Sequence, residues 1–206
     1  KAGQILDNFN HLVMLRVRSV TTANLLAEQV PQVDVVHLTP MSGVTDTAAV
    51  LTLLDADLID LGVVLNPKPE RNATVLGRDF WMAVLATDHA LAQRPVDATV
   101  ALEELLEQPF VLATGGCTAN ARSLGAAAGL TLRDIRVEVR EWNSAFSLVR
   151  EGVGVTLVPE MALPAQRKGL RVMPLTVPLH REFALVGSPT RPPSAAASAL
   201  LAMVAD

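Results

Sequence analysis

Serine and threonine hydroxyls gather in three short segments of this chain, two of which also contain glycine, and this chemistry suits the binding of a small anion. Hydroxyl groups, and free backbone N–H groups where a helix begins, donate hydrogen bonds to carboxylates without adding charge. The threonines also suit plain helix caps, a role that can coexist with ligand contact. The candidate contacts are Ser19, Thr21, Thr22, Ser42, Thr45, Thr114, Gly115, Gly116, Cys117 and Thr118.

The same residue types give little support for catalysis or for a metal site. Ser19, Ser42 and Ser123 lack the G-x-S-x-G context of a nucleophilic serine. The four histidines are scattered, and one cysteine excludes an internal disulfide and a cysteine-built zinc site. The pair Gly115-Gly116 is too short for a dinucleotide fingerprint. We therefore expect no enzyme activity, no cofactor and no metal.

Three other features have both a functional and a structural interpretation. Cys117, at a predicted helix start, suits a redox sensor, but a disulfide switch needs a second cysteine, so a packing or cleft-lining role is favoured. His89 suits a local hydrogen bond better than a catalytic base. The helical spacing of Glu103, Glu104 and Glu107 favours a solvated helix face over an acidic site.

The composition indicates an aliphatic core and an acidic surface. Of the 206 residues 50% are hydrophobic and 3% aromatic, and the formal net charge is −4. An acidic surface does not attract phosphate backbones, so this chain alone is expected to bind nucleic acid poorly. No segment reaches the roughly 18 uninterrupted apolar residues typical of a membrane-spanning helix. The start at Lys1 has no apolar signal region, and we expect a cytoplasmic protein.

Strand and helix patterns alternate along the chain in two rounds. The first round predicts strands at 12–18, 33–38 and 60–65, with helices at 21–30 and 46–54. The second round predicts strands at 80–86, 110–113, 135–139 and 153–158, helices at 102–106 and 119–128, a late strand at 181–186 and a closing helix at 195–204. This order indicates an α/β fold of two Rossmann-like lobes with parallel pairing and right-handed crossovers. Small ligands bind beyond the carboxyl ends of such parallel strands, where the hydroxyl segments lie.

The stretch 147–160 predicts a short helix, a glycine stop, a buried strand and a proline stop. Gly152 suits the position after a helix, where φ is often positive. The run Val153–Val158 is nearly all β-branched, as expected of a strand covered on both faces. Pro159 ends that strand and can open the next helix.

Further candidate contacts come from residues near this stretch and from the first strand. Val153 and Gly154 are expected to approach a ligand from the edge of the second lobe. Trp142, just before the short helix, either lies over a bound ligand or fills the interface between the lobes. At the end of the first predicted strand, Arg16 or Arg18 can pair with an effector carboxylate.

Five short motifs follow one another along the chain. They are 58–63 (L-I-D-L-G-V), 87–92 (T-D-H-A-L-A), 102–112 (L-E-E-L-L-E-Q-P-F-V-L), 115–117 (G-G-C) and 148–159 (L-V-R-E-G-V-G-V-T-L-V-P). Each motif alone is weak evidence. Together, their order and spacing resemble the effector-binding domain of LysR-type transcriptional regulators, over nearly the whole chain.

The resemblance implies two lobes of the type 2 periplasmic-binding-protein fold, joined by two crossover strands. Lobe I would comprise residues 1–78 with 186–206 and lobe II residues 79–185, with a small anionic metabolite bound as effector in the cleft between them. The family's winged helix-turn-helix, which contacts DNA, is absent from this chain, and residues 1–10 resemble the end of the linker helix. A homodimer or homotetramer is also implied.

The chain departs from the family pattern at three points. Ala90 replaces the usual proline, Asp57 stands where glycine is common, and the first predicted helix is short. The short helix alters the expected shape of the ligand cleft. For the dimer, the candidate surfaces are apolar helix faces that one lobe does not bury entirely, with Leu25, Leu26, Leu53 and Leu54.

Two other functions are compatible with the same architecture. A free-standing periplasmic solute-binding protein of a transporter shares the two lobes, and a secretion signal would favour it. An enzyme with this fold would need a converging acid–base set, whereas the predicted cleft segments carry hydroxyls and glycines. The family motifs and the linker-like start at Gln4–Phe9 favour a sensory domain that binds an effector and does not contact a membrane.

Overall fold

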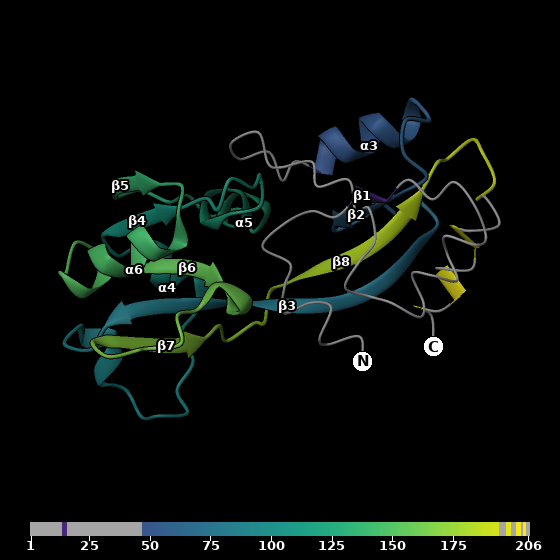
Figure 1. Ribbon diagram of the computed structural model, residues 1–206. Coiled ribbons are helices and arrows are strands. Elements are labelled where there is room, and N and C mark those ends of the chain that lie inside the picture. Colours follow the sequence, from purple (N-terminus) through teal and green to yellow (C-terminus); the bar gives the residue numbers. More distant parts are fainter. Residues whose placement is uncertain (1–13, 16–46, 194–196, 199–200, 203, 205–206) are drawn as a thin grey trace. The chain divides into compact units, whose positions relative to one another are not determined.

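The computed structural model describes residues 14–15, 47–193, 197–198, 201–202 and 204. The chain forms two compact units: unit 1 is Lys1–Arg78 with Arg181–Asp206, and unit 2 is Asp79–His180. Strands β3 (Ala73–Ala86) and β8 (His180–Gly187) each pass from one unit into the other (Figure 1). The second boundary expected from the sequence, at 185/186, falls inside β8, whereas the units change at 180/181.

In unit 1, helix α3 (Thr47–Asp55) packs on strand β2 (Leu61–Leu65). The sequence pattern predicts both elements. The helix places Val50 and Leu54 in a buried cluster with residues of β2 and β8. Helix and strand lie close because Gly62 has no side chain: a Cβ atom there would lie 2.4 Å from Cγ1 of Val50. Leu54 is fully buried, so its predicted place on an exposed dimer surface is wrong.

The pair β2–β8 carries a second apolar cluster, which includes described helical residues near the C-terminus. Leu61 and Val63 of β2 pack there with Phe183 and Leu185 of β8. Among the described residues near the C-terminus, 197–198, 201–202 and 204 are helical, and Ala197 is fully buried in this cluster. The closing segment therefore packs on unit 1.

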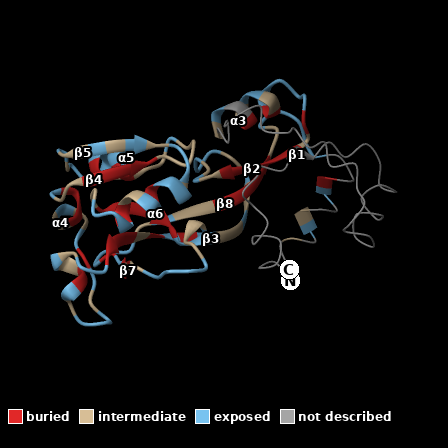
Figure 2. Ribbon diagram, turned by 60° about the vertical axis from the view of Figure 1, so that its left-hand side comes forward, coloured by how far each residue is buried: buried red, intermediate tan, exposed pale blue. Residues whose placement is uncertain are grey.

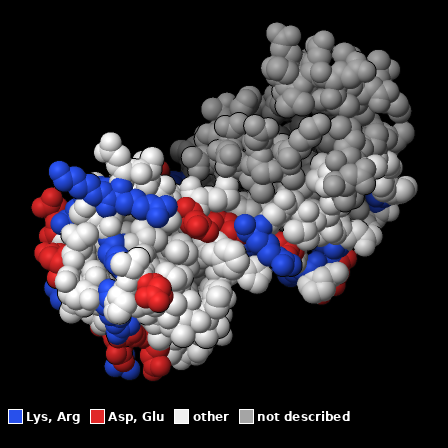
Figure 3. Space-filling model, turned by 90° about the horizontal axis from the view of Figure 1, so that it is seen from below, with Lys and Arg blue, Asp and Glu red and all other residues white. Residues whose placement is uncertain are grey.

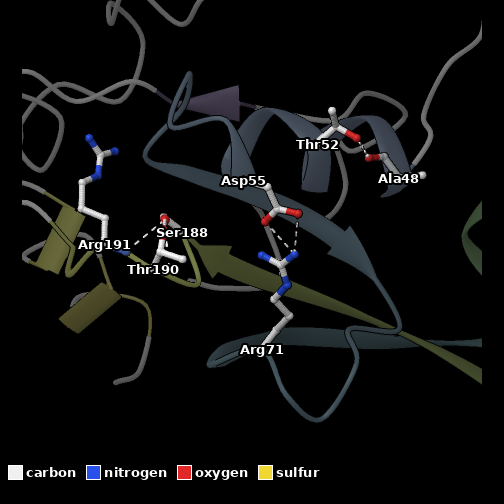
Figure 4. A network of polar contacts seen from close by, with 7 residues as sticks. All are labelled: Ala48, Thr52, Asp55, Arg71, Ser188, Thr190 and Arg191. Atoms are coloured by element: carbon white, nitrogen blue, oxygen red, sulfur yellow. Dashed lines mark hydrogen bonds and ion pairs between the residues drawn. The ribbon is translucent and has the colours of Figure 1, made fainter.

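Polar contacts connect the ends of these elements in unit 1 (Figure 4). Nη2 of Arg71, which precedes β3, donates to both carboxylate oxygens of Asp55 at the end of α3, at 2.8 and 3.0 Å. After β8, the Ser188 hydroxyl accepts the backbone N–H groups of Thr190 and Arg191. These contacts fix the turns at one end of the β2–β8 pair.

The direction of strand β1 (Met14–Leu15) corrects an expectation. The alternating pattern predicts parallel pairing between the first strand and β2, but β1 runs antiparallel to β2, with Met14 opposite Gly62. The direction depends on the course of the connecting residues, and local periodicity does not encode it. The other predicted elements of this part, at 21–30 and 33–38, lie outside the described residues.

Unit 2 is a mixed sheet with helices on both faces. β3 pairs antiparallel with β6 (Thr156–Pro159) and with β7 (Leu170–Pro174). β4 (Phe110–Ala113) pairs parallel with β5 (Ile135–Val139), and a bridge between Phe110 and Val155 brings β4 beside the start of β6. The predicted parallel pairing thus holds for β4 and β5.

Two apolar clusters sandwich this sheet, which explains the runs of apolar residues in its strands. Helices α4 (Leu102–Leu106) and α5 (Ala121–Ala127) contribute to the cluster that contains Leu112 and Leu157. Helix α6 (Trp142–Arg150) contributes to the cluster that contains Val111 and Val158. Strands β4 and β6 are consequently buried along their whole length (Figure 2).

The stretch 147–160 folds as predicted. Gly152 follows α6 with φ +72° and is thus in the left-handed region. Strand β6 is buried on both faces, and its last residue, Pro159, precedes the short 3-10 helix η2 (Glu160–Ala162). Two details differ. Trp142 and Asn143, expected just before the helix, form its first turn. The strand, expected at 153–158, comprises Thr156–Pro159.

Candidate functional site

The described part of the candidate site is the loop Thr114–Thr118, between β4 and α5. Two hydrogen bonds attach its start to the end of the neighbouring strand: Thr114 N–H donates to Val139 O at 3.0 Å, and Gly115 N–H donates to Arg140 O at 2.9 Å. Because β4 and β5 are parallel, the loop begins where the carboxyl ends of both strands meet. This is the edge at which the sequence predicts ligand contacts.

The Thr114 side chain stabilises a tight turn in this loop. Its Oγ1 accepts the Gly116 N–H at 3.4 Å, and its carbonyl accepts the Cys117 N–H at 2.9 Å. Gly115 and Gly116 have φ values of +58° and +71°, which explains why two glycines stand here. A hydroxyl that accepts one hydrogen bond still has a proton to donate. Thr114 can therefore donate to a ligand while it holds the turn.

Trp142 forms a wall beside the loop. It is half-buried at the start of α6, and it contacts both apolar clusters of unit 2. Its indole lies directly against Gly115, where a Cβ atom would come within 1.9 Å of Cζ2. The structure thus brings Thr114, Gly115 and Trp142 together, and the glycine is required for the indole to lie there.

Val153 and Gly154 have packing contacts inside unit 2. Val153 is half-buried against the α6 cluster. A Cβ atom at Gly154 would lie 2.4 Å from the carbonyl oxygen of Pro109, so the glycine allows two backbone segments to approach closely. Beside it, Val155 N–H donates to Pro109 O at 2.8 Å. Ligand contact at these two residues stays a prediction.

Asn120 is a residue of this site that the sequence analysis missed. It is the N-cap of α5: its Oδ1 accepts the N–H groups of Arg122 and Ser123, and its own N–H donates to the Ser123 hydroxyl. Its Nδ2 donates to the carbonyls of Cys117 and Thr118, both at 3.3 Å. The spacing N-x-x-S at a helix start was the available signal, because it matches a capping box.

His89 has the local hydrogen bond that the sequence favoured, whereas the packing or cleft-lining role of Cys117 stays a prediction. Cys117 is half-buried, and its Sγ lies 3.7 Å from the carbonyl oxygen of Gly115. His89 caps the 3-10 helix η1 (Ala90–Gln93), with Nδ1 accepting the Leu91 N–H at 3.2 Å, which confirms a local role. Neither contact requires chemistry beyond hydrogen bonding.

The acidic residues of α4 are part of a surface ion pair. Glu104 accepts from both terminal nitrogens of Arg94, one of them at 2.9 Å. The hydrogen bond from Arg94 lowers the pKa of the Glu104 carboxyl and raises that of the guanidinium. Glu103 and Glu107 are exposed, as a solvated helix face predicts.

A hollow with a volume of about 340 Å³ lies in unit 1. Its lining includes Arg71 and Arg191. Arg71 is engaged by Asp55, and Arg191 by Asp60 at 2.6 Å, so both guanidiniums are already neutralised by carboxylates. The hollow therefore offers little attraction to an anion.

The remaining candidate contacts fall on the first lobe: Ser19, Thr21, Thr22, Ser42 and Thr45 lie outside the described residues. Arg16 and Arg18 also lie outside them. Within the part of the chain that the structure describes, no group of three His, Cys, Asp or Glu residues is placed to hold a metal ion. The described helices include none with the length and hydropathy needed to span a membrane.

Comparison with known proteins indicates the same family as the sequence motifs. The family model described as LysR substrate binding domain matches residues 28–206. A protein of Bacillus subtilis (strain 168), described as the uncharacterized HTH-type transcriptional regulator YvbU, is 30% identical over 110 residues, which are 53% of this chain and 36% of that protein. The chain thus matches about a third of this relative's length.

Solved structures share the fold. The BenM effector binding domain with its effector benzoate superposes with a TM-score of 0.61 at 24% identity, over 77% of this chain and 73% of that one. The CcmR regulatory domain of Synechocystis PCC6803 in complex with 2-PG has a TM-score of 0.61 at 16% identity, over 78% and 79% of the two chains. With a family model that covers most of its length, and with the type 2 periplasmic-binding-like fold of these neighbours, the chain belongs to the LysR substrate binding domain family, the effector-binding domain of LysR-type transcriptional regulators.

Proposed function

We propose that the loop Thr114–Thr118 binds the anionic group of a small-molecule effector. The observation that carries the proposal is the Thr114 hydroxyl, which holds its own turn and keeps a proton to donate at the carboxyl ends of parallel strands. Trp142 supplies an apolar face next to it. The ligands of two structural neighbours, benzoate and 2-PG, are consistent with this class of effector.

The first lobe would complete this site with hydroxyls at Ser19, Thr21, Thr22, Ser42 and Thr45. The effector would then act by binding two arrangements of the lobes, or of a dimer, with different affinity. DNA would be contacted by a winged helix-turn-helix elsewhere in the full-length regulator. A free-standing solute-binding protein is not favoured, because the family model and the B. subtilis relative are those of transcriptional regulators.

A dimer is proposed as the working assembly. The half-buried Leu53 is the described residue of the predicted apolar face that still has exposed surface, since Leu54 is buried. Light scattering at tens of micromolar, on the order of weak-dimer affinities, tests this. A monomer at that concentration would count against the proposal.

The test of the binding proposal begins with a thermal-shift screen of metabolite anions, with benzoate and 2-PG included, against the 206-residue chain. Calorimetric titration of the best ligand then compares variants. Thr114→Val should weaken binding about tenfold, because it removes one hydrogen bond to a charged group. The matched control is Thr131→Val, the same change at an exposed position beyond α5. An unchanged Kd in Thr114→Val would refute the proposed contact.

A further inference from the structure

Asn66, the first residue after β2, has a backbone conformation that is unusual for its place in the sequence. Its φ is +48°, in the left-handed region, although Pro67 follows it and a following proline favours extended backbone. A residue is held in such a conformation only where the surrounding structure over-determines it, and such positions are frequent at switch regions. The contacts of Asn66 show what holds it.

Two polar groups of Asn66 bind the backbone of one residue, Glu182 of β8. The Asn66 N–H donates to Glu182 O at 2.8 Å, and Asn66 Oδ1 accepts the Glu182 N–H at 2.7 Å. The last regular pair of β2 and β8 is Leu65 with Phe183, so Asn66 extends the pairing by one residue. Arg78 Nε also donates to the Glu182 carboxylate at 3.1 Å, but its side chain is 61% exposed, and such surface pairs contribute little to stability.

This attachment lies next to the point at which β8 passes between the units. Unit 2 ends at His180, so Glu182 is the second residue of β8 that belongs to unit 1. On the other side of the boundary, the N–H of the buried Trp81 donates to Leu179 O at 2.9 Å, within unit 2. His180 and Arg181 therefore lie between an attachment of β8 to one unit and an attachment to the other.

Strand β3 is attached equally close to the boundary. Its first residue in unit 2, Asp79, is 2% exposed, and Asp79 Oδ1 accepts the Met161 N–H of η2 at 3.1 Å. The preceding residue, Arg78, is the last of β3 in unit 1 and makes the ion pair with Glu182. Both strands thus change unit within one or two residues.

We propose that Asn66 is a clamp, which holds β8 to unit 1 at the unit boundary. Bending between the units is then confined to residues 180–181 of β8 and to the link between Arg78 and Asp79 of β3. Any change in the arrangement of the units, such as the one proposed for effector binding, would turn about these residues. The inference goes beyond the proposed function and does not depend on which residues bind the effector.

Two variants separate the side-chain contact of Asn66 from its backbone conformation. Asn66→Gly adopts positive φ without strain but has no side-chain acceptor. Asn66→Asp keeps an oxygen that can accept the Glu182 N–H, and aspartate tolerates the left-handed region. Amide hydrogen exchange of Glu182 should be about fivefold faster in Asn66→Gly than in the parent, and close to the parent's rate in Asn66→Asp.

The test of the clamp is the distribution of distances between the units, measured by double electron–electron resonance on the 206-residue chain without ligand. Spin labels are attached at Thr52→Cys and Thr131→Cys, exposed positions of units 1 and 2, in a Cys117→Ser background. The parent should give a narrow distribution, Asn66→Gly a broader one, and Asn66→Asp one as narrow as the parent's. A label pair inside unit 2, at Val96→Cys and Thr131→Cys, should be unchanged in Asn66→Gly.

The other outcomes would overturn the clamp. An unchanged distribution between the units in Asn66→Gly, together with faster exchange of Glu182, would show that Asn66 makes a local contact only. A broad distribution in the parent or in Asn66→Asp would contradict the proposal as well. If Asn66→Gly also broadened the pair inside unit 2, the substitution would be unfolding the chain and not releasing a joint. Because no ligand is present, each of these failures leaves the proposed effector contact at Thr114 unaffected.

Discussion

At the scale of single residues, backbone conformation explains several residue choices in this chain. Asp57 and Asn66 both have positive φ, at +54° and +48°, but their side chains differ in what they contribute. Asn66 Oδ1 accepts the Glu182 N–H at 2.7 Å, whereas Asp57 makes a 3.5 Å ion pair with Arg191 in which both side chains are 45% exposed. Only at Asp57 does the left-handed conformation lack a strong compensating contact.

Asp57→Gly should therefore stabilise the protein. Glycine adopts positive φ at no steric cost, so the free energy of unfolding should rise by about 0.5–1 kcal/mol. Asn66→Gly is the matched comparison: the same backbone relief is offset there by the loss of a hydrogen bond worth about 1 kcal/mol, so the free energy of unfolding should not rise. Urea denaturation measures both. A destabilised Asp57→Gly would mean that the surface ion pair matters more than backbone strain.

At the scale of elements, the sequence predicts those whose signals are local. Helix α4 and strands β4 and β5 occupy the predicted residues, because proline or glycine and apolar runs delimit them. Strand β7 was missed, and so was the first half of β3. Residues 73–78 of β3 are partly buried or exposed, and they lack the apolar run that marks a buried strand. The predicted parallel pairing of β1 with β2 was wrong because the course of the connecting residues sets the direction of a strand.

The residues of the candidate site also divide into those that the sequence predicts and those that only the folded structure reveals. Its loop and Trp142 could be named from residue types that suit anion binding and a tight turn. Asn120 could have been named only as a helix cap, from the spacing N-x-x-S; its hydrogen bonds to two carbonyls form only in the folded loop. The close contact of Trp142 with Gly115 likewise joins residues that are far apart in sequence.

In the described part of the chain, strand β6 contains a buried hydroxyl without a hydrogen-bond partner, and its effect on stability can be tested. Thr156 is fully buried, and its hydroxyl has no hydrogen-bond partner among the described residues. Thr156→Val, which keeps the shape and removes the unsatisfied hydroxyl, should raise the free energy of unfolding by about 1 kcal/mol. The melting temperature should rise by about 2–4 °C for a chain of this size, with Thr131→Val unchanged. A lower melting temperature in Thr156→Val would show that the hydroxyl is satisfied in solution.

The ion pair between Arg94 and Glu104, which connects the end of η1 to α4, predicts a pH dependence. The pKa of Glu104 is lowered from its ordinary value of 4.5 by the hydrogen bond from Arg94. Its contribution to stability should be present above that ordinary pKa and be lost as pH falls through the folded-state pKa. The free energies of unfolding of the parent and of Glu104→Gln should thus differ at pH 7 and converge in acid, once the pH has fallen below the lowered pKa of Glu104. The adjacent, exposed Glu103→Gln is the control, and a difference that grows with acid would contradict this account.

At the scale of the whole molecule, the charge balance argues against DNA contact by this chain alone. The net charge is −4, and on the face shown in Figure 3 basic side chains lie beside acidic ones. Duplex affinity rests largely on Lys and Arg that neutralise phosphates. The chain alone should therefore show no retardation of duplex DNA at physiological salt. Retardation that disappears as salt is raised would reveal a basic surface that this account does not contain.

The most direct test of the central claim is a crystal structure of the chain with an anion from the thermal-shift screen. The account predicts the anion's oxygen atoms within hydrogen-bond distance, about 2.7–3.2 Å, of the Thr114 hydroxyl and the loop 114–119, with Trp142 beside the ligand. An anion found only elsewhere, with this loop occupied by the protein's own side chains, would contradict the account.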